Sequence, residues 1–158
     1  MIRRPLCWSL AAALVPVSVV AGAPVEGHCT YEGRTLVLVD GMAYRTKPGA
    51  AEIVIALGST RFDRARPLAA QDPEEDQRLQ SREAGTGLVQ IILERDDVLA
   101  VHVQLADGSA ISLAGPDGLK LTRNDATRVA GAFAIANEAL NLTCDLHFDA
   151  GPVLDPHP

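Results

Sequence analysis

The sequence has 158 residues, of which 47% are hydrophobic and 22% charged, and its 14 Lys and Arg against 20 Asp and Glu residues give a net charge of −6 at pH 7. This acidic balance disfavours nucleic acid and anionic membrane surfaces as partners, because both repel a negatively charged protein. The length suits one domain with its own hydrophobic core, and no second domain is implied.

The first 23 residues follow the order of a secretory signal peptide, which is basic, then apolar, then small. Arg3 and Arg4 are the basic residues, residues 6–20 are apolar apart from two serines, and Ala21-Gly22-Ala23 is a small-residue cleavage site. We therefore expect export and removal of residues 1–23, with the cut near Ala21, Gly22 or Ala23. A retained membrane anchor is the alternative, because the uncharged run is long enough to span a bilayer. Membrane contact is expected only in that case.

Cleavage would also change the cysteine count, because Cys7 leaves with the leader and Cys29 and Cys144 remain. An even pair in an exported chain predicts a disulfide, and two separate buried thiols are the alternative. Such a bridge would tie the last strand to the first and contribute about 4 kcal/mol in the chain-entropy description. The 135 residues left after removal of 1–23 carry 12 basic and 20 acidic side chains, a net charge of −8.

Most of these residues alternate between apolar and polar with a period of two, which predicts strands that bury one face. The clearest case is 140–148, where Cys144 falls on the apolar face. Residues 52–57 are apolar on both faces after the first, which indicates a central or covered strand. The expected strands, of which adjacent short ones could merge, are 27–31, 34–39, 42–46, 52–57, 88–94, 98–105, 109–113, 119–122, 127–135 and 140–148.

Turn signals separate the strands. Asp40-Gly41 and Asp107-Gly108 suit tight two-residue hairpins, since both central positions tolerate positive φ. Asp72-Pro73-Glu74-Glu75 predicts the start of a helix over 73–84, with an N-cap, a proline in the first turn and a glutamate that completes a capping box. This helix is mostly polar, so we expect it on the surface.

The predicted fold class is mainly β, an antiparallel meander that forms a sandwich or a small barrel with one short surface helix near 73–84. Residues 24–150 are expected to form the single β-rich domain. Residues 151–158 contain three prolines and are expected to be a flexible C-terminal tail.

The candidate contact site is the loop before the helix. It contains Arg61, Arg64 and Arg66, whose guanidinium groups could clamp a carboxylate or phosphate of a ligand or partner. The alternative is that these arginines pair with acidic residues nearby. The acidic residues in question are Asp63, Asp72, Glu74 and Glu75.

Signatures of metal, cofactor and catalytic sites are missing from the sequence. His102 and His147 lie on the less apolar faces of two predicted strands, and with Asp145 they could hold a metal if those strands were adjacent. No close ligand spacing such as H-x-x-x-H supports that site, so we expect no metal and no cofactor. There is no G-x-S-x-G, H-E-x-x-H or phosphate-loop motif, and we expect no catalytic residues.

Two short segments resemble a loose group of small exported proteins of Gram-negative bacteria without assigned function. The segments are Tyr31-Glu32-Gly33-Arg34 and the run from Leu142 to Val153, in which Phe148-Asp149-Ala150 is followed by Pro152. Those proteins have a leader, a β-rich body and an F-D-A-P-type end, which Gly151 interrupts here. The resemblance implies a periplasmic location and transfers no activity.

We therefore expect a periplasmic or secreted, non-catalytic envelope protein that binds another macromolecule, as an inhibitor, immunity protein or chaperone-like module does. The expected partner is an envelope protein of unknown identity. One alternative is a small β-barrel that carries an apolar ligand among its medium-sized aliphatic side chains. A second alternative is a hydrolase with an unrecognised polar cluster.

Overall fold

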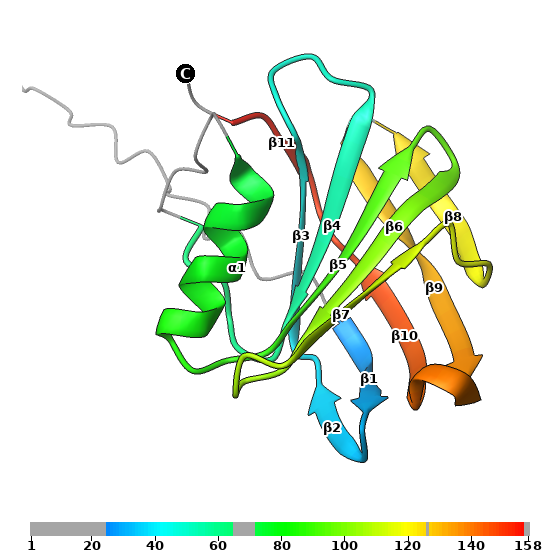
Figure 1. Ribbon diagram of the computed structural model, residues 1–158. Coiled ribbons are helices and arrows are strands. Elements are labelled where there is room, and N and C mark those ends of the chain that lie inside the picture. Colours follow the sequence, from blue (N-terminus) through cyan, green and yellow to red (C-terminus); the bar gives the residue numbers. More distant parts are fainter. Residues whose placement is uncertain (1–24, 65–71, 126, 157–158) are drawn as a thin grey trace, which may run out of the picture.

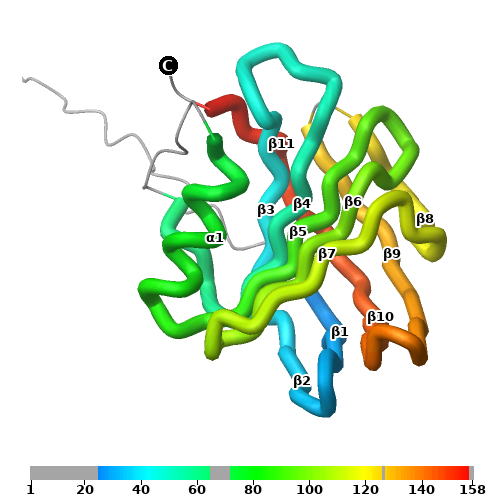
Figure 2. Tube along the Cα trace, in the orientation of Figure 1, coloured from blue at the N-terminus to red at the C-terminus, as the bar shows by residue number. Residues whose placement is uncertain are grey.

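The computed structural model describes residues 25–64, 72–125 and 127–156. These residues form strands and one α-helix, α1 (Pro73–Glu83), as Figures 1 and 2 show. The predicted signal peptide, with its cleavage site at Ala21, Gly22 and Ala23, lies outside the described residues.

The strands form two sheets, which we name sheet A and sheet B. The strands of sheet A are β3 (Asp40–Arg45), β4 (Glu52–Gly58), β5 (Leu88–Glu94), β6 (Asp97–Gln104), β7 (Ala110–Ala114) and β11 (Val153–Leu154). The strands of sheet B are β1 (Val25–Tyr31), β2 (Arg34–Val37), β8 (Leu119–Asp125), β9 (Arg128–Asn137) and β10 (Leu142–Asp149). A 3₁₀-helix, η1 (Glu138–Leu140), connects β9 to β10.

The spatial order is β11-β3-β4-β5-β6-β7 in sheet A and β2-β1-β10-β9-β8 in sheet B. The chain starts in sheet B, crosses to sheet A for the meander β3 to β7, returns to sheet B for β8 to β10, and ends in sheet A. All neighbours are antiparallel except β11, which runs parallel to β3. The predicted antiparallel meander is confirmed in its sandwich form, with two sheets that do not close into a barrel.

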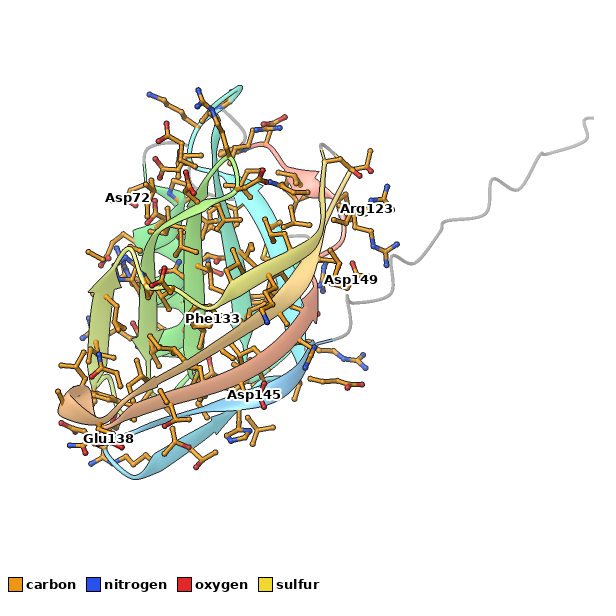
Figure 3. All side chains as sticks on the ribbon, turned by 90° about the vertical axis from the view of Figure 1, so that its right-hand side faces the viewer. Asp72, Arg123, Phe133, Glu138, Asp145 and Asp149 are labelled. Carbon is orange, nitrogen blue, oxygen red and sulfur yellow. A yellow bond between two sulfur atoms is a disulfide. The ribbon has the colours of Figure 1, made fainter. Side chains whose placement is uncertain are left out.

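The core lies between the two sheets and is built from the alternation that the sequence predicted. In β10 the buried positions are Leu142, Cys144, Leu146 and Phe148, and the residues between them are exposed or half-buried. Phe133 of β9 is fully buried on the same side, and its position is labelled in Figure 3. Burial of such a phenylalanine contributes about 3 kcal/mol. Strand β4 has no exposed residue, which confirms the covered strand that its two apolar faces predicted.

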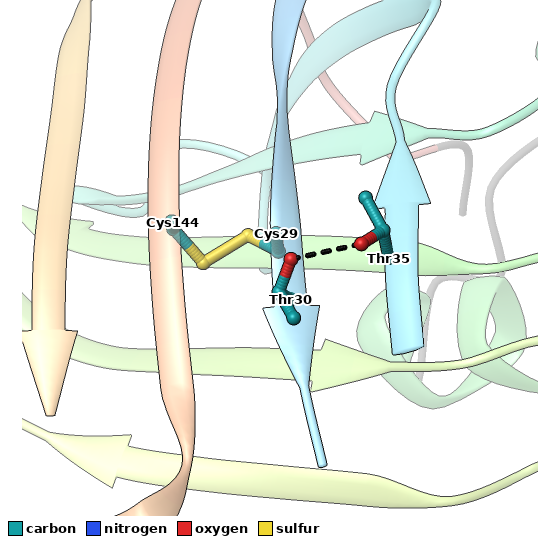
Figure 4. The surroundings of a disulfide bond; sticks show 4 residues. All are labelled: Cys29, Thr30, Thr35 and Cys144. Carbon is teal, nitrogen blue, oxygen red and sulfur yellow. Dashed lines mark hydrogen bonds between the residues drawn. A yellow bond between two sulfur atoms is a disulfide. The ribbon is translucent and has the colours of Figure 1, made fainter. Parts of the chain in front are cut away.

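The disulfide predicted from the cysteine count is confirmed. Cys29 of β1 and Cys144 of β10 are direct partners in the ladder, and the bond links residues 115 apart in sequence (Figure 4). Both cysteines belong to the buried core, with 0% and 2% of their surface exposed. The bridge therefore joins the N-terminal and C-terminal strands of sheet B from its inner face.

The predicted hairpin at Asp40-Gly41 is wrong. These residues begin β3, where the chain has just crossed from sheet B to sheet A. Gly41 is needed because a Cβ there would lie 2.8 Å from Val25 Cγ2, and Asp40 is buried with its carboxylate occupied by hydrogen bonds. The Asp-Gly pair thus serves close packing rather than a turn.

The Asp107-Gly108 turn is confirmed as the β6–β7 connection, with Gly108 at φ +87°. The amide of Leu105 donates to the carbonyl of Ser109, so the loop holds three residues rather than two. The predicted helix is also confirmed, because the Asp72 carboxylate accepts a hydrogen bond from the Glu75 amide at the N-cap. The helix ends one residue earlier than predicted.

Part of the segment 151–158, predicted as a flexible tail, pairs with sheet A, and residues 157–158 lie outside the described residues. Val153 and Leu154 form β11 against β3, and Arg45 lies 3.4 Å from the Asp155 carboxylate. Pro156 is buried. Contacts with residues more than a hundred positions earlier order this segment, and no local pattern in the sequence reports them.

Candidate functional site

The loop after β4 is fixed to the body of the protein by a buried carboxylate. Asp40 is 1% exposed, and its two oxygens accept hydrogen bonds from Nη1 and Nη2 of Arg64 at 2.9 and 2.7 Å. The same carboxylate accepts from the amides of Phe62 and Gly41 at 2.9 and 3.0 Å. Four donors therefore surround Asp40, which compensates the cost of burying its charge.

A second contact holds the start of this loop. The Ser59 amide donates to the carbonyl of Gly87, and the Ser59 hydroxyl accepts from the Gly87 amide at 2.9 Å. Since Ser59 and Arg64 are both tied to other elements, the residues between them are held in a defined position. We name residues 59–64 the arginine loop.

The arginine loop presents Arg61 to solvent beside a hollow. The hollow has a volume of about 220 Å³ and lies between the loop and the C-terminal end of α1. Thr60, Arg61 and Phe62 line one side, and Gln80 and Thr86 line the other. Arg61 is exposed and has no ion pair among the described residues, so its guanidinium is available to a partner.

The three arginines predicted as one site thus have different roles. Arg64 forms an ion pair with Asp40. The expectation that it pairs with Asp63, Asp72, Glu74 or Glu75 is therefore wrong. The sequence does not reveal the role of Asp40, because Asp40 lies 24 residues before Arg64 and the Asp-Gly pair by itself predicts a hairpin. Arg66 lies outside the described residues.

A second polar cluster lies under α1, on the outer face of sheet A. Gln90 is 1% exposed, and its amide donates to the Tyr44 hydroxyl and to the carbonyl of Glu74. Gln77 of α1 is also buried, with Nε2 2.9 Å from the Met42 sulfur. Within the described structure no donor reaches Oε1 of Gln77 or Gln90. The helix therefore packs on the sheet through polar side chains.

Burial in this cluster changes the ionisation of its members. Desolvation raises the pKa of Tyr44, and the nearby charge of Glu74 adds to the shift. Desolvation also raises the pKa of Glu74, with repulsion from Glu52 as the second cause. Burial thus disfavours the charged form of both groups, and the contacts between α1 and sheet A in this cluster are hydrogen bonds.

The two histidines considered for a metal site are not brought together. His102 is on β6 in sheet A, and His147 is on β10 in sheet B. His102 Nδ1 lies 2.5 Å from the Ser112 hydroxyl across the β6–β7 ladder, and desolvation lowers its pKa. No described group of three His, Cys, Asp or Glu side chains is arranged to hold a metal ion.

The Ser112–His102 pair is the arrangement closest to a nucleophile and its base among the described side chains, yet it lacks further parts. No carboxylate among the described side chains hydrogen-bonds to His102 to orient its ring. A serine nucleophile needs both an oriented base and donors for the developing oxyanion. The Ser112–His102 pair by itself therefore does not make up such a site.

Comparisons with known proteins add no assignment. No protein-family model, curated protein or solved structure matches this chain. Within residues 25–64, 72–125 and 127–156, no helix is both long and apolar enough to cross a membrane.

Proposed function

We propose that this protein is an exported, non-catalytic envelope protein that binds another macromolecule, and that Arg61 on the arginine loop makes a central contact. The observation that carries the proposal is the exposed guanidinium of Arg61, without an ion pair among described residues, on a loop that Asp40 and Gly87 hold in place. A fixed loop loses little conformational entropy when it binds, so its contacts retain most of their energy.

The chemistry of the hollow indicates the kind of partner group. Arg61 suits a carboxylate, Phe62 offers an apolar surface, and Thr60, Gln80 and Thr86 offer hydrogen-bonding groups. Asp63 also lines the hollow, so the hollow carries one basic and one acidic side chain. An acidic side chain on a protein surface, which brings apolar and polar neighbours with it, fits this mixed lining.

The proposed location is the periplasm or the cell exterior. The Cys29–Cys144 bond supports an oxidising compartment, where such bonds persist. The basic, apolar and small order of residues 1–23 supports export. The alternative of an apolar-ligand carrier loses its premise, since the sheets do not close into a barrel and side chains fill the space between them.

The test is capture of an envelope partner by the exported protein, followed by affinity measurement with the captured protein. Arg61→Glu is expected to weaken binding at least tenfold, about 1.4 kcal/mol, because the substitution places like charges together. Arg95→Glu is the matched control, since Arg95 is exposed on the β5–β6 turn, away from the hollow. Equal loss with both variants, or none with either, would refute the role of Arg61. Stoichiometric lipid in the purified protein would refute the non-carrier assignment.

A further inference from the structure

The sandwich has four sheet edges among the described strands, and three of them carry features that block pairing with another strand. β8 is interrupted by a bulge between Leu121 and Arg123 and carries Lys120 and Arg123. β2 has four residues and begins with Arg34, and β11 has only two residues. Short strands, charges and bulges are the usual means by which proteins protect such edges.

The edge formed by β7 carries neither a charge nor a bulge, and β7 is longer than β2 and β11. Its five residues, Ala110–Ala114, contain no charge and no proline, and their register with β6 is regular. β6 occupies one side of β7, and no described strand pairs with the other side. An uncharged and regular edge of this kind is a template for a further strand.

The hydrogen-bonding pattern shows which backbone groups of β7 are available. The amide of Leu105 donates to the carbonyl of Ser109, and the amide of Gly115 donates to the carbonyl of Leu99. Because bonded and non-bonded pairs alternate along an antiparallel ladder, odd-numbered residues of β7 bond to β6 and even-numbered residues point away from it. The residues whose N–H and C=O groups point outwards are Ala110, Ser112 and Ala114.

The sequence of β7 is nearly the same in both directions. Ala-Ile-Ser-Leu-Ala is symmetric about Ser112, apart from the exchange of isoleucine for leucine. An antiparallel pair of identical strands has a two-fold axis, so a strand with this symmetry can pair with itself and match like with like. The central residue, Ser112, is also one whose backbone groups point outwards.

We propose that two copies of this chain associate through their β7 strands, antiparallel and centred on Ser112, to form one sheet that continues from sheet A of one copy into sheet A of the other. In this register the hydrogen-bonded pairs are Ser112 with Ser112 and Ala110 with Ala114 of the second copy. Ile111 meets Leu113 of the second copy at the closer, non-hydrogen-bonded positions.

The side chains fit this arrangement on both faces. Ile111 and Leu113 are half-buried against the core and would cover each other across the axis. The outer face presents only alanine and serine, which leave room for a close approach. The acidic residues that flank β7 in sequence, Asp107 and Asp117, lie outside the strand, and Asp107 is ion-paired with Arg34. No like charges therefore oppose each other within the paired strands.

The dimer is expected to be weak, because a contact based on one short strand is smaller than a standard interface. We expect a Kd on the order of micromolar to tens of micromolar. The Kd should decrease as salt is added, because both copies carry net negative charge and salt screens the repulsion between them.

Sedimentation velocity of the exported protein over roughly micromolar to millimolar concentrations tests the association. Ser112→Pro removes the central outward N–H without removing a backbone hydrogen bond to β6, so this variant should remain monomeric. The side-chain contact of Ser112 with His102 is lost in this variant and in Ser112→Ala alike. Ser112→Ala keeps that N–H and should dimerise like the unmodified chain. Circular dichroism and the melting temperature of each variant are measured to check that both variants are folded. A chain that stays monomeric throughout, or Ser112→Pro that still dimerises, overturns the proposal.

A cysteine cross-link tests the register independently. Opposite residues of a hydrogen-bonded antiparallel pair have Cα atoms about 5.5 Å apart, within the range that a disulfide bridges. Ser112→Cys should therefore form a covalent dimer on mild oxidation, whereas Ala110→Cys should not, because Ala110 faces Ala114 of the second copy. Equal cross-linking by both variants would refute the two-fold register. If Ser112→Cys forms no covalent dimer and cross-links only to a different protein after addition of an envelope extract, the β7 edge binds that protein and the proposal is overturned.

Discussion

At the residue scale, the fold depends on a charge that is buried rather than displayed. Asp40 is enclosed where β3 begins, and it joins the crossover from sheet B to the arginine loop through Arg64 and the Phe62 amide. The ion pair is partly shielded from solvent, because 26% of the Arg64 side chain and only 2% of the Asp40 side chain are exposed. Removal of either partner would leave the other without its main counter-charge.

We expect Asp40→Asn to lower the free energy of unfolding by about 2–4 kcal/mol, because the partly buried Arg64 guanidinium loses its counter-charge. Urea unfolding measures the change. Glu75→Gln is the control, since the Glu75–Arg78 pair lies on the surface and its loss should cost about 0.5 kcal/mol or less. The double variant Asp40→Asn/Arg64→Ala should cost less than the sum of its single changes. Additive losses would contradict a direct coupling between the two side chains.

At the element scale, α1 is held by polar rather than apolar contacts. Its buried residues are Pro73, Gln77 and Ser81, while Leu79, its large apolar residue, is 44% exposed. Hydrogen bonds from Gln90 and Gln104 to the helix backbone carry part of the contact. A buried acceptor without a donor costs free energy, so Gln77 Oε1 is a point where the packing can be improved.

Gln77→Leu should therefore raise the melting temperature and add about 1 kcal/mol to the free energy of unfolding. The leucine would pack against Met42 and the apolar residues around it on the outer face of sheet A. Gln80→Leu is the matched control and should not stabilise the protein, because Gln80, three residues further along α1, is less buried than Gln77. Thermal unfolding of both variants decides the matter. A lower melting temperature for Gln77→Leu would show that the glutamine is satisfied in solution.

The elements that the sequence predicted correctly are those whose signals are local. The period of two identified β10 and its inward Cys144, and Asp72-Pro73 identified the start of α1. The features it missed depend on distant partners. Asp40 belongs to a strand because Arg64 and the crossover require it there, and β11 exists because β3 offers it an edge. The candidate site was found only as a cluster of arginines, since local spacing cannot distinguish Arg61 from Arg64.

At the scale of the whole molecule, the two sheets are joined by crossovers of the chain and by the core between them. The hairpin β1–β2 and the strands β8 to β10 contribute sheet B, so the ends of the sequence must meet for this sheet to form. Ladders that join distant parts of a chain are slow to form and costly in entropy. The disulfide acts at this point, because it keeps β1 and β10 together in the unfolded chain.

Loss of the disulfide should lower the free energy of unfolding by about 2–5 kcal/mol, since a bond across 115 residues restricts the unfolded chain strongly. The replacement Cys29→Ala/Cys144→Val limits the cavity left in the core, and urea unfolding measures its effect. Reduction of the unmodified protein should give a loss of similar size. Circular dichroism should show that the strands persist in both cases, because the β1–β10 ladder and the core remain. An unchanged unfolding midpoint after reduction would show that the bridge contributes nothing to stability.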